Sequence, residues 1–169
     1  MLKEKRMILV GAAGRNLGKT HLIVQLIRKY KDQGRTVAAV KVVTIHESHS
    51  KCPRGEDSCG MCEGLQECFE IREEKNTGKK DTMIFLEAGA DRVFLIRCRP
   101  KGLEEAMRAF LEMVPNEDVI ICESNSVRTV LEPEKFLMLH RPDGPIKPSA
   151  AAVLPLADVL IERKDNAQQ

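Results

Sequence analysis

Eight residues near the start of the chain have the types and spacing that bind phosphate: Ala13, Gly14, Arg15, Asn16, Leu17, Gly18, Lys19 and Thr20. They fit the P-loop template G-x-x-x-x-G-K-[ST] except that Ala13 replaces the first glycine. In such a loop, backbone N–H groups and the N-terminus of the following helix form a nest for phosphate oxygens. We therefore predict that residues 13–20 bind a nucleoside triphosphate, GTP or ATP. A turn that contains Gly-Lys-Thr by chance is the alternative.

Individual residues of this series have distinct expected roles. The Lys19 ammonium would reach the β- and γ-phosphates, and the Thr20 hydroxyl would bind Mg²⁺. Gly18 lets the backbone approach the phosphates closely, and Asn16 adopts the left-handed conformation at a lower cost than most residues.

A magnesium ion and an attacking water need acidic residues nearby, and two positions are candidates. Glu123 directly follows the apolar run 119–122, so it is expected at the carboxyl edge of a strand, where the phosphate loop also lies. Asp81 comes before a short helical segment. We predict catalytic roles for Lys19, Asp81 and Glu123, with Mg²⁺ held by Thr20 and Glu123. A solvated strand-end charge is the alternative for Glu123, and a helix N-cap is the alternative for Asp81.

Four cysteines form a second cluster with the spacing C-x6-C-x2-C-x5-C: Cys52, Cys59, Cys62 and Cys68. Four thiolates suit Zn²⁺ or an iron–sulfur cluster. The spacing differs from that of a standard zinc ribbon, so a redox-active dithiol or plain thiols in a loop stay as alternatives. Cys98 and Cys122 lie in apolar runs and are expected to be small core residues.

Apolar and periodic patterns predict the elements that position these residues. Strands are expected at residues 7–10, 36–43, 92–98, 119–122, 136–139 and 159–161. Helices are expected at 18–33, 81–87 and 103–114, with a helical turn at 149–154. Residues 44–80 show no sustained periodicity and are interpreted as a Cys-rich insertion. The alternation predicts a single three-layer α/β domain over residues 1–169, with a mostly parallel sheet of about five to seven strands.

Composition narrows the classes of partner. Net charge is +2, from 27 basic and 25 acidic residues that are interleaved along the chain. No block of like charge indicates a nucleic-acid or membrane surface, and no run approaches the ~20 apolar residues that a membrane helix needs. Residues 7–14 are short for the apolar region of a signal peptide. We expect a cytoplasmic protein with reduced cysteines, which binds neither nucleic acid nor membrane.

With these motifs placed, the chain resembles the B-protein family of molybdopterin-guanine dinucleotide biosynthesis, a P-loop GTP-binding family of the SIMIBI class. Three stretches carry the resemblance. The first is 7–43, which includes Ala38-Ala39-Val40-Lys41. Another is Lys80-Asp81-Thr82 followed by Glu87-Ala88-Gly89-Ala90-Asp91, similar to the family's D-[ST]-x-R…AGA segment. A third is Val119–Glu123, an apolar strand that ends in glutamate.

The resemblance implies a GTP-binding accessory factor that helps to assemble or insert a molybdenum cofactor, with weak intrinsic hydrolysis. It places Asp81 and Glu123 near magnesium or the γ-phosphate. It also implies a homodimer that works with a cofactor-assembly protein or a recipient metalloenzyme. Val42 stands where the family has histidine, Ser124 stands where it has glycine, and the cysteine segment is additional. These departures indicate a divergent branch and leave another metallocofactor enzyme as an alternative recipient.

Guanine selection in related GTPases uses an Asn-Lys-x-Asp tetrad, and the nearest candidate here is Glu162-Arg163-Lys164-Asp165. Asp165 is therefore predicted to contact the base, with ordinary exposed charges as the alternative. Two other functions stay open. One is a small-molecule kinase, although residues 124–148 contain only Arg128 and Arg141 for an arginine-rich lid. The other is a metal-stapled nucleotide-binding module without turnover, in which residues 44–80 contact a partner.

Overall fold

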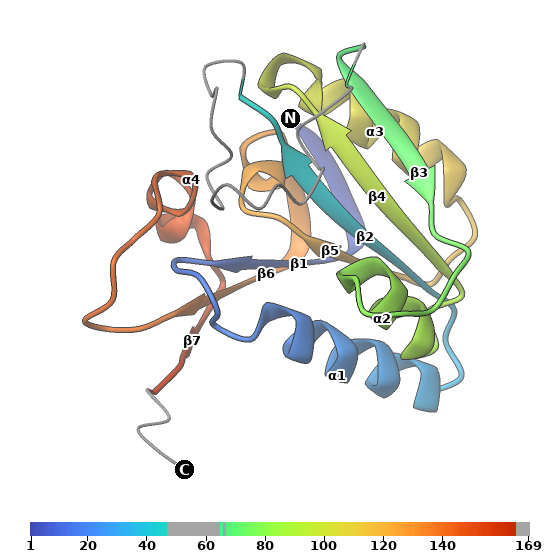
Figure 1. The fold of residues 1–169 in the computed structure, drawn as a ribbon, viewed down its shortest axis with the longest axis horizontal. Helices are drawn as coiled ribbons and strands as arrows, with labels where there is room; N and C mark the ends of the chain where they lie inside the picture. The colour runs from blue at the N-terminus through green and yellow to red at the C-terminus, as the bar shows by residue number, and fades with distance from the viewer. Residues whose placement is uncertain (47–64, 66, 165–169) are drawn as a thin grey trace.

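A computed structural model describes residues 1–46, 65 and 67–164. Within these residues the chain forms a seven-stranded sheet with the order β3-β4-β2-β5-β1-β6-β7 (Figure 1). The strands are β1 (Leu2–Ala12), β2 (Val37–Thr44), β3 (Phe69–Glu73), β4 (Arg92–Cys98), β5 (Val119–Glu123), β6 (Leu131–His140) and β7 (Val159–Glu162). The α-helices are α1 (Lys19–Asp32), α2 (Asp81–Glu87), α3 (Leu103–Met113) and α4 (Pro148–Ala151), and short 3₁₀ turns lie at Pro100–Gly102, Ser126–Thr129 and Leu154–Leu156.

The sheet is mostly parallel, as the alternation of strands and helices predicts. β1 lies between β5 and β6 and is parallel to both, and β2 is parallel to β4 and β5. β7 extends the sheet in parallel beside β6, whereas β3 runs antiparallel to β4. The α/β class and the mostly parallel sheet are therefore confirmed. None of the described helices is long and apolar enough to cross a membrane.

Helices cover both faces of the sheet. Successive residues of β1 illustrate this, because Leu9 packs in one cluster of buried side chains and Val10 packs in the other. α1 and α2 lie side by side over the cluster that contains Val10 and Phe85 (Figure 1). α3 covers the opposite face, where the Phe110 ring meets Phe94 edge-on at 5.3 Å between centroids. A strand that is buried on both faces must be apolar throughout, which is why residues 7–10 form a continuous apolar run.

Three strands differ from the expectation, and one of them, β6, begins at Leu131 rather than at residue 136. β1 begins at Leu2 rather than at residue 7, since its charged first half alternates partly buried and exposed side chains and pairs with the start of β6. β3 lies inside the stretch expected to lack regular structure. Its five residues include Glu70 and Arg72, and Glu70 forms an ion pair with Arg97 of β4. A short edge strand with charged side chains depends on its neighbour and carries little local signal.

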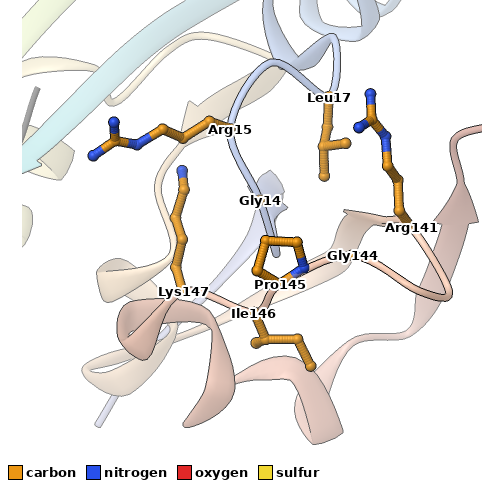
Figure 2. A pocket seen from close by; sticks show the side chains of 8 residues that line it. All are labelled: Gly14, Arg15, Leu17, Arg141, Gly144, Pro145, Ile146 and Lys147. Atoms are coloured by element: carbon orange, nitrogen blue, oxygen red, sulfur yellow. The ribbon is translucent and has the colours of Figure 1, made fainter. Parts of the chain in front are cut away.

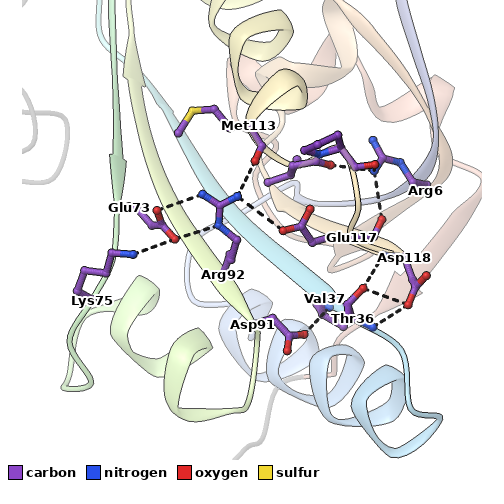
Figure 3. A network of polar contacts seen from close by, with 12 residues as sticks. Arg6, Thr36, Val37, Glu73, Lys75, Asp91, Arg92, Met113, Glu117 and Asp118 are labelled. Carbon is purple, nitrogen blue, oxygen red and sulfur yellow. Dashed lines mark hydrogen bonds and ion pairs between the residues drawn. The ribbon is translucent and has the colours of Figure 1, made fainter.

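Polar side chains link the strands where β2, β4 and β5 begin and the antiparallel β3 ends (Figure 3). Arg92 Nε at the start of β4 donates to Glu73 Oε1 of β3 at 3.0 Å. The Asp118 carboxylate, just before β5, accepts hydrogen bonds from the Thr36 backbone N–H at 2.8 Å and from the Thr36 hydroxyl at 3.1 Å. These contacts join four neighbouring strands at one edge of the sheet. The carboxyl ends of β1, β2 and β5 lie at the opposite end of the strands, and the residues with predicted catalytic and binding roles lie there.

Candidate functional site

The turn from β1 into α1 contains two residues with left-handed backbone, a conformation that occurs in anion-binding nests. Asn16 has a φ of 54° and Gly18 has a φ of 81°, both in the left-handed region. Gly18 is the N-cap of α1, and no side chain among the described residues caps that end. The first turn of α1 also holds no acidic residue. The N–H groups and the positive end of the helix dipole are therefore available to an anion.

Ala13, the departure from the template, is explained by packing. It is buried in the cluster of side chains on the α3 face, so its methyl group belongs to the core. Its backbone is fixed on both sides, because Ala13 N–H donates to the Leu139 carbonyl and Lys147 N–H donates to the Ala13 carbonyl, each at 2.8 Å. The first position of the series therefore anchors the loop to β6 and to the segment after it.

Charged side chains from four elements converge beside this loop. Lys19 Nζ at the start of α1 lies 3.3 Å from Glu123 Oε1 at the end of β5. Lys41 Nζ from β2 lies 3.7 Å from the same oxygen and forms an ion pair with Asp81 Oδ2 of α2. The Thr20 hydroxyl donates to Asp81 Oδ1 at 3.2 Å. The structure thus brings the predicted residues Lys19, Thr20, Asp81 and Glu123 into one cluster.

Glu123 is buried rather than solvated. Only 5% of the residue is exposed, so the solvated strand-end alternative is wrong. Its position follows from register, since Glu123 pairs with Val10 of β1 and with Lys41 of β2 at the carboxyl ends of the strands. Glu123 Oε2 has no hydrogen-bond partner among the described residues. Buried carboxylate oxygens are normally satisfied, so this oxygen keeps accepting capacity that no described residue uses.

Asp81 is the first residue of α2, and the N-cap position belongs to Lys80. The N-cap alternative for Asp81 is therefore wrong, because its carboxylate bonds to Thr20 and Lys41. Burial opposes ionisation of Asp81, but the hydrogen bond and charge of Lys41, together with Thr20 and Lys19, outweigh it and hold the pKa of Asp81 below its ordinary value. Asp81 is consequently ionised at neutral pH.

Lys41 and Asn125 contribute to the site without having been predicted for it. Lys41 is a buried lysine within an apolar strand, and such a lysine needs a charged partner. The isolated charge of Lys41 in an apolar run was the signal in the sequence that could have indicated its place in the site. Asn125 follows β5 by two residues and bonds the Ala12 backbone, accepting from its N–H at 2.9 Å and donating to its carbonyl at 3.0 Å. A Cβ on Gly11 would lie 2.6 Å from Asn125 Oδ1, so a larger residue at that point would displace Asn125. No local pattern indicated Asn125.

The oxygen atoms of the cluster fit magnesium. Mg²⁺ is commonly held by one or two carboxylates together with substrate phosphates and water. The Thr20 hydroxyl and the carboxylates of Asp81 and Glu123 supply that set, and Glu123 Oε2 retains its full accepting capacity. The described residues contain no group of three or more His, Cys, Asp or Glu side chains placed for a metal ion. A site of two carboxylates therefore depends on phosphate oxygens for its remaining ligands.

The predicted cysteine site and the predicted base contact fall largely outside the structure. Cys52, Cys59, Cys62 and Asp165 lie outside the described residues, whereas Cys68 is partly buried and has a free thiol. Zinc or iron–sulfur binding stays a prediction. The two remaining cysteines, Cys98 and Cys122, are fully buried core residues as expected, and burial raises the pKa of both thiols.

A pocket of about 310 Å³ adjoins the loop (Figure 2). It is lined by Gly14, Arg15, Leu17, Arg141, Gly144, Pro145, Ile146 and Lys147. One wall is the loop of residues 13–20 and the other is the segment that follows β6.

Comparisons of the chain with protein-family models, with curated proteins and with solved structures give no match.

Proposed function

We propose that this α/β domain is a P-loop nucleotide-binding protein that binds a nucleoside triphosphate with Mg²⁺ through residues 13–20 and hydrolyses it slowly. The observation that carries the proposal is the convergence of Lys19, Thr20, Asp81 and Glu123 beside an uncapped helix N-terminus. The sequence predicted these four residues, and they come from three elements, α1, α2 and β5, which Lys41 of β2 links through ion pairs with Asp81 and Glu123.

Each residue has a role that follows from its chemistry. The loop N–H groups and the α1 N-terminus bind phosphate oxygens, and Lys19 neutralises the β- and γ-phosphates. Thr20, Asp81 and Glu123 hold the magnesium and its water shell through oxygen atoms. The metal, when bound, neutralises charge that develops on the phosphates.

Slow hydrolysis follows from the surroundings of Glu123. An efficient reaction needs a group that orients the attacking water or accepts its proton. Glu123 Oε1 lies close to two ammonium groups, those of Lys19 and Lys41. A carboxylate that is engaged by two ammonium groups is not free to orient the attacking water, so turnover is expected to stay low without a partner protein.

The nucleotide and the biological role are proposed from the family resemblance. GTP is favoured over ATP, and the protein acts as an accessory factor in molybdenum-cofactor assembly or in the maturation of another metalloenzyme. A homodimer is proposed on the same basis. A reconstitution assay with molybdopterin and a recipient apoenzyme tests this role. If nucleotide binds normally and yet never raises cofactor incorporation, the accessory role is refuted while nucleotide binding stands.

Nucleotide binding itself is tested by titration calorimetry with GTP and ATP, in the presence of Mg²⁺ and in EDTA. Lys19→Ala is expected to abolish binding, because it removes the ammonium group that contacts the phosphates. Lys29→Ala, at the far end of the same helix, is the matched control and should bind like the wild type. Circular dichroism checks that both variants are folded. Undiminished affinity in folded Lys19→Ala would refute the assignment.

A further inference from the structure

We infer that Arg163, the residue directly after β7, binds the α-phosphate of the nucleotide beside the phosphate loop. This inference rests on the proposed binding of a nucleoside triphosphate and names a further cation for it. The sequence suggests two other roles for Arg163, as part of a base-binding tetrad or as an ordinary exposed charge. Its surroundings in the structure favour the phosphate, because the side chain is partly buried next to the start of α1.

Two consecutive residues of β6 hold Arg163 and the phosphate loop near each other. The Arg163 backbone N–H donates to the His140 carbonyl at 2.8 Å, and the Ala13 backbone N–H donates to the Leu139 carbonyl at 2.8 Å. β6 lies between β1 and β7 in the sheet, so the loop leaves on one side of β6 and Arg163 on the other. The main chain of Arg163 is thereby fixed at the carboxyl end of the sheet.

The side chain of Arg163 reaches the N-terminus of α1. Its Nη2 atom lies 4.0 Å from the point that a Cβ on Gly18 would occupy. Gly18 is the N-cap of α1, which no side chain among the described residues caps. The guanidinium therefore lies beside the N–H groups to which the proposed function assigns the phosphates.

The guanidinium of Arg163 has no anionic partner among the described residues. Its Nε is buried and has no hydrogen-bond partner there. Buried donors are normally satisfied, and a cation beside a helix N-terminus meets the positive end of the helix dipole. Both costs are removed when an anion with several oxygen atoms lies between the guanidinium and the helix. A phosphate group meets this need, since a guanidinium binds two of its oxygens through parallel N–H groups.

The charge of the site also leaves room for a further cation. Lys19 and Lys41 form ion pairs with Asp81 and Glu123, so these four side chains are neutral as a group. A nucleoside triphosphate is strongly anionic, and a bound magnesium offsets only part of its charge. Arg163 supplies positive charge that no described carboxylate neutralises.

The strand order indicates which phosphate Arg163 contacts. Glu123 ends β5 on one side of β1, whereas Arg163 follows β7, which lies beyond β6 on the other side. The proposed magnesium and γ-phosphate belong next to Glu123 and Lys19. A triphosphate that crosses the loop away from these residues brings its α-phosphate, the one bonded to the nucleoside, towards Arg163.

Titration calorimetry of Arg163→Gln with GTP, GDP and ATP, each in the presence of Mg²⁺, tests this contact. The substitution keeps a polar side chain and removes the charge and the fork of N–H groups. Affinity for all three nucleotides should fall by a similar factor, about 10- to 100-fold, because each carries an α-phosphate and the lost hydrogen bonds are charge-assisted. Lys164→Gln removes the charge of the exposed neighbouring residue and is the matched control, which should bind like the wild type.

A second variant separates the fork from the charge. Arg163→Lys keeps the charge, so its loss of affinity should be smaller than that of Arg163→Gln and again similar for the three nucleotides. Circular dichroism checks that every variant is folded. Unchanged affinity in both folded variants would overturn the inference, and so would an equal loss in Lys164→Gln, which would indicate a general effect of charge.

The nucleotide series identifies the group that Arg163 contacts. A loss for GTP and ATP without a loss for GDP would place Arg163 at the γ-phosphate and overturn the inference. Unequal losses for GTP and ATP would overturn it by placing Arg163 at the base. A wild type that binds GTP and not GDP would also overturn it, since the α-phosphate would then contribute little. No binding of any nucleotide by the folded wild type would refute the proposed function itself.

Discussion

Replacing Lys41 with methionine removes one charge from the buried cluster and keeps a side chain of similar length. In the wild type the two lysines balance the carboxylates of Asp81 and Glu123. The Lys41 side chain is only 7% exposed and that of Glu123 only 6%, so water cannot replace the lost ammonium. Removing one partner of a buried ion pair typically costs about 3–5 kcal/mol.

The lower end of that range applies here, for two reasons. The Asp81 side chain is 33% exposed and is partly hydrated, and Glu123 keeps its contact with Lys19. We expect Lys41→Met to lower the free energy of unfolding by about 3 kcal/mol. For a chain of 169 residues this corresponds to a fall in Tm of about 6–12 °C.

A double-mutant cycle measures the coupling. The chain contains no tryptophan, so urea unfolding is followed by far-ultraviolet circular dichroism for Lys41→Met, Asp81→Asn and the double variant. The second substitution should recover part of the loss, because it restores the charge balance. The surface pair Lys3–Glu132, with side chains 74% and 49% exposed, provides the control, and Lys3→Met should cost less than about 1 kcal/mol. Additivity within about 0.5 kcal/mol would refute a coupled buried pair.

Three other properties are predicted. The pKa of Asp81 lies below 3.8, so the stability that its ionised form contributes is present above about pH 4 and is lost as the pH falls through that lowered pKa. The difference in unfolding free energy between the wild type and Asp81→Asn should therefore shrink in this acid range. A difference that stays constant with pH would contradict this prediction. Cys98 and Cys122 should resist iodoacetamide in the native protein and react in denaturing urea, as read by peptide mass spectrometry, because burial raises the pKa of both thiols. Gly11→Ala should destabilise the protein by about 1–3 kcal/mol in urea unfolding, since its methyl group would overlap Asn125; a neutral result would show that Asn125 moves freely.

The sequence predicted those parts of the site that carry strong local signals. An apolar run followed by a charge located Glu123, and parallel strands end at one edge, so its proximity to the phosphate loop could be expected. Lys41 could not be assigned in this way. Its isolated charge in an apolar strand indicates that it needs a charged partner, but only the sheet register identifies that partner as Glu123, some eighty positions away in the chain. The pocket beside the loop could not be predicted for the same reason. The hydrogen bond from Lys147 N–H to the Ala13 carbonyl joins segments that are distant in the chain and share no local pattern.

The two lysines of the cluster differ in their exposure, and this difference reconciles the buried Glu123 and the partly exposed Asp81 with the proposed anionic ligand. The Lys19 side chain is 26% exposed at the open end of α1, so it can exchange Glu123 for a phosphate oxygen. Lys41 is enclosed between Asp81 and Glu123 and has no comparable path. If the proposed triphosphate binds and Lys19 turns to it, Lys41 still neutralises one of the two carboxylates, and the proposed magnesium would balance the other. Without Lys41, both acids would face the phosphates unpaired at short range and oppose the binding that the loop favours.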